Sequence, residues 1–275
     1  MRKKIGLIKQ AILSRLRKYL LGKHVVALAT QSGSNLFLVH VEDYGVGHEL
    51  LQKGSYGTDE LTRALSFVTE SCQILIVGAH IGSFAIPLSQ KCKHLFAIEA
   101  NPTSYTLLQH NLVLNKIQNC STFNVAADNH SGKISFLVNS ANSGGSKRIP
   151  KVKKFDYYYD KPQTISVLAE RLDDILGSIE VDLIIMDIEG SETFALEGMP
   201  KLLSRAKVLI VEYAPNHLRF VGGVTVDDFL KNITPHFSTL LVPSLKKKVT
   251  GIEIKKLLVD MYNKNQWDSG IIFEK

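Results

Sequence analysis

Three carboxylate side chains stand close together in the second half of the chain, in a pattern suited to acid–base chemistry. Asp187, Glu189 and Glu192 lie within six residues, directly after an apolar run that predicts a buried strand. Carboxyl groups so crowded raise one another's pKa or recruit a cation, and either effect would help to deprotonate an alcohol. Helix capping by Ser191 accounts for Glu192 but not for Asp187. We nominate Asp187 as a base or metal ligand, with Glu189, Glu192 and the loop residue His217 as alternates.

A glycine-containing turn and a second acidic residue follow two earlier apolar runs. Gly78-Ala79-His80-Ile81-Gly82 closes the run at 74–77 and would let the backbone approach a ligand closely. Glu99 follows the next run, where a carboxylate can accept both hydrogen bonds of a ribose diol. Each feature alone is common for structural reasons, as a turn glycine or as an acid at a helix N-terminus. Together they predict a nucleoside ligand.

A third apolar run ends in Asn124-Val125-Ala126-Ala127-Asp128. The small residues leave room for a flat base, and Asp128 could accept a hydrogen bond from an exocyclic amine. A lone Asp before a turn is otherwise unremarkable.

These residues all fall where predicted strands end. The expected strands are residues 73–77, 94–99, 122–127, 181–188, 207–213, 239–242 and 271–273, and the expected helices are 59–69, 82–90, 102–115, 191–203 and 225–232. Residues 134–138 should pair with 122–127 through the turn at 129–132. Such alternation predicts an α/β fold with a mostly parallel sheet flanked by helices. Ligands bind at the carboxyl ends of the strands in such sheets, which is where the candidate residues lie.

The ordered set of motifs resembles the FkbM-type S-adenosylmethionine-dependent methyltransferases over residues 54–215. The matching segments are Gly54–Gly57, Val77–Gly82, Glu99–Pro102, Asn124–Asp128, Asn142–Ser146, Val181–Glu192 and Val211–Pro215. The resemblance implies a class I, Rossmann-like sheet of seven strands with the last antiparallel. It also implies O-methylation of a hydroxyl on a sugar, a glycan or a small metabolite.

By position, the resemblance also assigns roles to the candidate residues. The cofactor residues would be Gly78, Ala79, His80 and Gly82 around the amino-acid part, Glu99 and Asn101 at the ribose, and Ala127 and Asp128 at the adenine. Asp187, Glu189 and Glu192 would border the site of methyl transfer. No residue is assigned as a dedicated metal ligand, although a divalent cation is compatible with the acidic residues.

Two departures from the family pattern keep other functions open. Ile76 stands where members usually have Asp, and His80 where they have Asn. A catalytically inactive interaction protein with this fold is therefore one alternative. A nucleic-acid methyltransferase is less favoured, because the residues after the fourth strand read Asp187-Ile188-Glu189-Gly190 instead of a D/N/S-P-P-Y/F motif and their acidity would repel a polyanion. The glycine spacing does not fit a nicotinamide-dependent oxidoreductase.

The net charge of +7 is concentrated at the start of the chain. Eight of the 33 Lys and Arg residues lie in residues 1–23, where no Asp or Glu occurs, so the remaining chain is nearly neutral. Apolar residues at helical spacing make this segment a basic amphipathic helix, suited to an anionic membrane surface, to the body of the protein or to a second subunit. The cysteines Cys72, Cys92 and Cys120 form no zinc or disulfide pattern. We expect a cytoplasmic protein, peripheral to the inner face of the membrane if the helix binds lipid.

The chain therefore divides into three expected parts. Residues 1–23 form the helix, 24–72 an N-terminal extension or cap, and 73–275 the catalytic domain. Within the domain, residues 139–163 lack clear periodicity and combine a Gly/Ser stretch, a basic cluster and three tyrosines. We predict that they form a lid loop over a small-molecule or glycan acceptor, with a solvated loop as the equal alternative.

Overall fold

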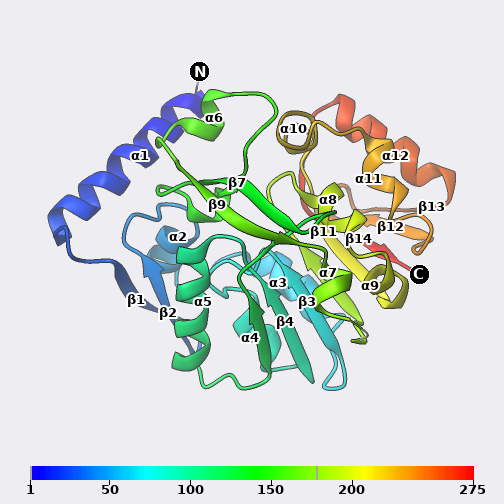
Figure 1. Cartoon of the computed structure of the whole chain (residues 1–275), viewed down its shortest axis with the longest axis horizontal. Helices are drawn as coiled ribbons and strands as arrows, with labels where there is room; N and C mark the ends of the chain where they lie inside the picture. Colours follow the sequence, from blue (N-terminus) through cyan, green and yellow to red (C-terminus); the bar gives the residue numbers. More distant parts are fainter. Residues whose placement is uncertain (1, 178) are drawn as a thin grey trace.

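The computed structural model of the chain describes residues 2–177 and 179–275 and contains a central sheet of eight strands (Figure 1). These are β3 (Gln73–Val77), β4 (His94–Ile98), β5 (Cys120–Phe123), β10 (Leu183–Met186), β11 (Val208–Tyr213), β12 (Thr239–Val242), β13 (Lys247–Thr250) and β14 (Asp268–Glu274). Their order is β13-β12-β14-β11-β10-β3-β4-β5. The five strands from β11 to β5 run parallel, and β14 is antiparallel to both of its neighbours. The mostly parallel α/β sheet is confirmed, and β13 adds an eighth strand to the seven expected.

Helices bury both faces of this sheet, because the side chains of its strands alternate between two apolar clusters. Ile74 and Ile76 of β3 pack into one cluster, and Leu75 and Val77 pack into the other. The first cluster is covered by α2 (Val46–Lys53), α3 (Thr58–Leu65), α4 (Ala85–Ser89) and α5 (Pro102–Leu114). The second is covered by α7 (Leu172–Ile175), α8 (Glu192–Glu197), α9 (Pro200–Arg205), α11 (Val226–Lys231) and α12 (Ile252–Asn263). This double covering holds the carboxyl ends of the parallel strands in fixed register.

A second, four-stranded sheet lies beside those carboxyl ends. It consists of β6 (Ala126–Ala127), β7 (Gly132–Val138), β8 (Lys147–Arg148) and β9 (Gln163–Glu170) in the order β6-β9-β7-β8. The expected pairing of residues 134–138 with 122–127 is wrong, since β7 pairs antiparallel with β9 and β8. The predicted third strand is split: its first part stays in the main sheet as β5, and its last two residues join β9.

The N-terminal part forms a separate layer against the sheet. Helix α1 (Arg2–Leu21) leads into a hairpin of β1 (Ala27–Ser32) and β2 (Asn35–His40). The hairpin is tied to α5 because the Asn111 side chain accepts a hydrogen bond from the Leu38 N–H and donates one to the Leu38 carbonyl. No helix in the part of the chain that the structure describes is long and apolar enough to cross a bilayer.

Several helices differ from their expected bounds. The predicted helix 191–203 is two helices, α8 and α9, which are separated at Gly198, where a Cβ would overlap the carbonyl of Asp128. Helix α4 begins only at Ala85, after the glycine turn. The capping box of Thr225 and Asp228 confirms the predicted start of α11. The remaining short elements are α6 (Phe155–Tyr158), α10 (Pro215–His217), η1 (Ser143–Gly145), η2 (Leu218–Gly222) and η3 (Pro243–Leu245).

Candidate functional site

The glycine turn after β3 brings the backbone of two neighbouring strands into contact. Gly78 has a φ of +92°, and a Cβ at this position would overlap the carbonyl oxygen of Asp187 at the end of β10. Its N–H donates to the carbonyl of Ile98 at the end of β4. Both the dihedral angle and the close approach require glycine, so Gly78 lets the carboxyl ends of β3, β4 and β10 converge.

Glu99 lies directly after β4 at this convergence. Its Oε2 accepts a hydrogen bond from the His80 N–H at 2.7 Å, and its Oε1 accepts one from the Asn101 N–H at 2.8 Å. The side chain is buried, and burial raises the pKa of Glu99 to about 7. Each carboxyl oxygen keeps a second lone pair, so Glu99 can still accept two hydroxyl hydrogen bonds.

A narrow cavity of about 60 Å³ opens in front of Glu99. Gly78, His80, Glu99 and Ala127 line it together with Asp187. Ser143, Gly144 and Ser146 of the predicted lid segment form another part of its wall. Its volume is well below the ~300 Å³ at which ligand pockets usually begin. A nucleoside therefore requires this cavity to widen, and residues 143–146 together with Ala127 of β6 and Phe136 of β7 form the walls that are not built on the central sheet.

Four candidate cofactor residues do not line this cavity. Ala79 is buried and absent from its walls. Gly82 is buried against Leu108. Asn101 is the N-cap of α5, where its side chain accepts a hydrogen bond from the Thr103 N–H. Asp128 is 1% exposed, and its carboxylate contacts Arg148 at 3.2 Å. The structure thus gives these side chains structural contacts in place of a position at the cavity.

His80 lies in the left-handed backbone region and carries an unpartnered buried nitrogen. Its Nε2 is 2.7 Å from Ser143 Oγ, which donates to Asp43 Oδ2 at 2.9 Å. Because the Ser143 proton is used toward Asp43, His80 must donate from Nε2, and its Nδ1 is the unprotonated acceptor. Within the described residues, no hydrogen-bond donor reaches that buried Nδ1. Burial lowers the pKa of His80 and keeps the ring neutral.

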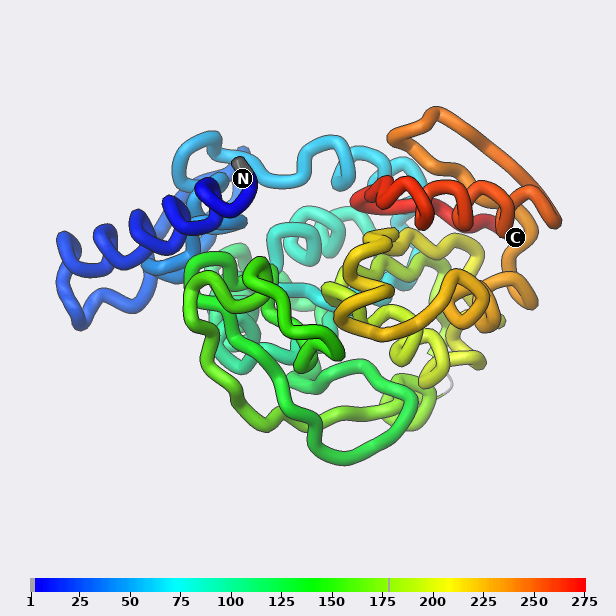
Figure 2. Tube along the Cα trace, turned by 90° about the horizontal axis from the view of Figure 1, so that it is seen from above, coloured from blue at the N-terminus to red at the C-terminus, as the bar shows by residue number. Residues whose placement is uncertain are grey.

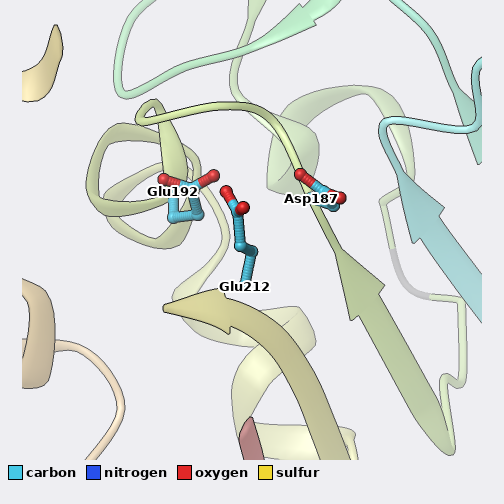
Figure 3. A group of neighbouring side chains, drawn as sticks. All are labelled: Asp187, Glu192 and Glu212. Atoms are coloured by element: carbon cyan, nitrogen blue, oxygen red, sulfur yellow. The ribbon is translucent and has the colours of Figure 1, made fainter. Parts of the chain in front are cut away.

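The acidic residues converge from three different elements (Figure 3). Asp187 follows β10, Glu192 begins α8 and Glu212 lies near the end of β11. One carboxyl oxygen of each lies within 4.8 Å of the others. Glu192 accepts hydrogen bonds from the N–H groups of Ile188 and Gly190, which fixes its orientation. Three converging carboxyl oxygens could hold a divalent cation or share protons.

Electrostatics divides the acidic residues into two kinds. Burial, and next the charge of Glu212, raise the pKa of Asp187 well above its ordinary value, and burial also raises the pKa of Glu192 and Glu212. The Asp187 carboxyl remains exposed to the cavity, so the charges of the neighbouring carboxylates, more than burial, account for its raised pKa. Glu189 is the exception: burial alone would raise its pKa, but the ammonium of Lys147 and His217 lower it. Lys147 Nζ lies 2.7 Å from Glu189 Oε2.

His217 bridges two of these carboxyl groups. Its Nε2 lies 3.3 Å from Glu189, and its Nδ1 lies 3.4 Å from Glu212. Trp267 donates its indole N–H to the other oxygen of Glu212 at 2.8 Å. The sequence offered His217 as an alternate to Asp187, and the structure places it inside the acidic cluster.

A second cavity, of about 380 Å³, lies between helices α2 and α3 and the strand ends. Tyr56, Glu60 and Arg63 line it from the N-terminal side. Gly78, Ala79, His80, Asp187, Glu189, Trp267 and the family-atypical Ile76 line it from the side of the sheet. Asp187 and Glu189 also line the first cavity, so they stand at the junction of the two.

Sequence reasoning missed Glu212 and the role of Lys147. Glu212 is an acidic residue in an otherwise apolar strand that ends at the same edge as β10, and this signal was available. Lys147 belongs to the basic cluster expected to face an acceptor. It is instead 5% exposed and paired with Glu189, whereas Lys151 and Lys153 of that cluster face solvent.

The sequence matches the family model described as Methyltransferase FkbM domain over residues 77–241. The chain belongs to the FkbM methyltransferase family. The matched segment runs from the last residue of β3 into β12 and includes Glu99, Asp187, Glu189, Glu192 and Glu212. The chain is therefore a member of a family of S-adenosylmethionine-dependent methyltransferases with the class I methyltransferase fold.

Curated relatives of the chain fall into two groups. The 2-O-methyltransferase NoeI of Sinorhizobium fredii (strain NBRC 101917 / NGR234) is 29% identical over 65% of this chain and 76% of the relative. A tRNA (guanine(37)-N(1))-methyltransferase of Ciona intestinalis is 34% identical over 31% of this chain. The chain spans only 20% of that relative's length. Among solved structures, M. jannaschii TYW2 in complex with AdoMet aligns with a TM-score of 0.47 and 16% identity, over 91% of this chain and 87% of that chain.

Proposed function

We propose that this FkbM-family chain transfers a methyl group from S-adenosylmethionine to a hydroxyl oxygen of a sugar, a glycan or another small metabolite. The observation that carries the proposal is the position of Asp187. Its carboxyl, with a raised pKa, lines both the cavity beside Glu99 and the larger cavity beneath helices α2 and α3. A base at this junction can reach an acceptor in the larger cavity. The 2-O-methyltransferase NoeI, a relative over most of its length, supports oxygen as the acceptor atom.

The residues beside the first cavity fit the cofactor. Glu99 keeps free lone pairs for the two ribose hydroxyls, and Ala127 leaves space for a flat base. The unpartnered Nδ1 of His80 can accept a hydrogen bond from an ammonium group. This acceptor would replace the carboxylate that members usually have at position 76. When bound, the cofactor supplies a methyl group on a sulfonium centre, which an oxygen nucleophile can accept.

The chain's own residues would activate and hold the acceptor. Asp187 takes the hydroxyl proton onto its carboxylate, and its raised pKa makes it a better match for a proton transfer near neutral pH. Such a base typically contributes ~10²–10⁴-fold in rate, and positioning of the two reactants contributes ~7–11 kcal/mol. Glu189, held ionised by Lys147, offers a fixed acceptor for a second hydroxyl.

The test compares two variants against a panel of monosaccharides and nucleotide sugars, with S-adenosylhomocysteine release as the readout. Asp187→Asn should lower turnover by ~10²–10⁴-fold while calorimetric affinity for S-adenosylhomocysteine changes little. Asp227→Asn, an exposed position on α11, is the matched control and should keep full turnover. Wild-type turnover in Asp187→Asn would refute the role of this residue. Loss of turnover in the presence of a chelator, restored by Mg²⁺, would assign Asp187, Glu192 and Glu212 to a cation instead.

A nucleic-acid acceptor is the second candidate, because two curated relatives modify tRNA. Those similarities cover 31% and 39% of this chain, and the site itself carries four acidic side chains against Lys147 and His217. A surplus of negative charge around the transfer site favours a neutral acceptor over a polyanion. Methyl transfer to bulk tRNA that exceeds transfer to every sugar tested would reverse this preference. A non-enzymatic scaffold would show no calorimetric heat with millimolar S-adenosylmethionine.

A further inference from the structure

Helix α1 turns its apolar side chains outward. Its large apolar residues that face solvent are Ile5 (58% exposed), Ile8 (45%), Ile12 (58%), Leu16 (47%), Tyr19 (82%) and Leu20 (71%). We call this set the α1 stripe. The residues recur at intervals of three and four, so they lie along one side of the helix. Figure 2 shows α1 along the margin of the molecule, with this helix as the outermost element at that end. An apolar stripe of this size left in water indicates a surface that is covered in the working state.

The opposite side of α1 is fixed to the body by polar contacts. Gln10 donates to the Tyr44 carbonyl at 2.8 Å, and Ser14 donates to the Glu42 carbonyl at 2.6 Å. Arg17 donates to the carbonyl of Val41 at 2.6 Å. Ala11 and Ser14 are buried in this contact. The helix therefore cannot roll its stripe onto the body without breaking these bonds, so the body is not what covers the stripe.

Exposed cations border the stripe on both sides. At the ~100° per residue of an α-helix, Lys9 falls at one edge of the stripe, between Leu16 and Leu20, and Lys4 and Arg15 fall at the opposite border. Arg15 also donates to the Asp160 carbonyl at 3.2 Å but stays exposed. Lys23 follows just beyond the helix end and is also exposed. Residues 1–23 contain no acidic residue to balance these charges. An apolar strip with cations at its edges is complementary to a surface whose interior is apolar and whose outer layer is anionic.

We propose that the α1 stripe docks this protein on the surface of an anionic lipid bilayer. The stripe enters the boundary between headgroups and acyl chains, while Lys4, Lys9 and Arg15 meet the lipid phosphates. A second copy of the chain fits less well. Two stripes facing each other would bring two cationic helices side by side, which like-charge repulsion opposes. The proposal concerns where the protein is held and is independent of the acceptor that it methylates.

The test is co-sedimentation of the full chain with vesicles of phosphatidylcholine and phosphatidylglycerol, compared with vesicles of phosphatidylcholine alone. We expect binding to the anionic vesicles that weakens with added salt. The triple variant Ile8→Ser/Ile12→Ser/Leu16→Ser should lower the partition coefficient at least ~100-fold, as expected from removal of three buried aliphatic side chains. Lys9→Gln should lower it about fivefold, the effect of one cation at an anionic surface.

The matched control is Val113→Ser on α5, which removes an apolar side chain that is 76% exposed but lies away from α1. It should bind vesicles as the wild type does. Each variant is checked for an unchanged thermal transition, since all four replaced apolar side chains are exposed. Equal pelleting of the triple variant and the wild type would overturn the proposal. The proposal would also be overturned if the wild type never pelleted with vesicles but formed a concentration-dependent dimer that the triple variant abolished.

Discussion

The buried ion pair between Lys147 and Glu189 gives the sharpest prediction about how the site is held together. Lys147 Nζ lies 2.7 Å from Glu189 Oε2, and the two side chains are only 6% and 19% exposed. Lys147→Met keeps the aliphatic stem but leaves a carboxylate without its main partner. An exposed pair of equal length, Lys207 with Asp182 at 2.7 Å, provides the control because the Lys207 side chain is 75% exposed.

The two substitutions should differ several-fold in cost. Removal of one partner of a buried pair typically costs ~3–5 kcal/mol, whereas an exposed pair contributes ~0–1 kcal/mol. His217 lies 3.3 Å from Glu189 and can compensate in part, so we expect the lower end, about 3 kcal/mol, for Lys147→Met. Lys207→Met should leave the free energy of unfolding nearly unchanged, because its ammonium is exposed to solvent. The double variant Lys147→Met/Glu189→Gln should recover much of the loss.

Urea unfolding at pH 7.5, followed by far-UV circular dichroism, measures these free energies. The pKa of Glu189 is lowered in the folded protein, so its pairing stabilises the fold above the ordinary Glu pKa and is lost as pH falls through the lowered value. The difference between wild type and Lys147→Met should therefore shrink on acidification. Equal costs for Lys147→Met and Lys207→Met, or a difference that grows at low pH, would refute the claim that Glu189 is an ionised, buried partner.

Three further predictions concern the cofactor side of the site. Gly78→Ala should destabilise the protein well beyond Gly33→Ala, because both glycines have positive φ but only Gly78 abuts the Asp187 carbonyl. The control, Gly33→Ala, should cost about 1–2 kcal/mol in thermal unfolding. Burial raises the pKa of Glu99 from 4.5 to about 7, so its contribution to stability should decrease as pH rises across that window, and Glu99→Gln should flatten this dependence in thermal melts. Hydrogen exchange in 139–163 should slow when S-adenosylmethionine is added, since Ser143, Gly144 and Ser146 line the cavity and would contact the bound cofactor; unchanged exchange would contradict a closing role for this segment.

The sequence predicted well what depends on local pattern. Gly78 and Glu99 were identified because a turn glycine and an acid after short apolar runs mark strand ends, and strand ends of a parallel sheet converge. Asp187, Glu189 and Glu192 were placed at a strand end for the same reason, and their role in methyl transfer stays a prediction. The capping box at Thr225 needed only a residue type and a spacing of three.

What the sequence did not predict depends on contacts between distant residues. The pairing of β7 with β9 is such a contact, because nothing near residues 134–138 indicates which strand will lie beside them. Asp128 was expected to face an adenine, but Arg148 of β8 reaches its carboxylate, and that strand was not foreseen. The sequence also left open what the apolar side of α1 faces, because an amphipathic pattern suits a membrane surface, the body of the protein or a second subunit, and the structure leaves that side exposed.

The central claim is that Gly78, Glu99 and Ala127 form a binding site for S-adenosylmethionine next to Asp187. Titration calorimetry with S-adenosylhomocysteine tests it most directly, because it needs no acceptor. We predict one saturable site per chain in the wild type and in Asp187→Asn, and a loss of affinity of at least about tenfold in Glu99→Ala, as expected when hydrogen bonds worth ~1.5–3 kcal/mol to a charged group are removed. Absence of binding by the wild-type chain, or an unchanged affinity in Glu99→Ala, would contradict the account.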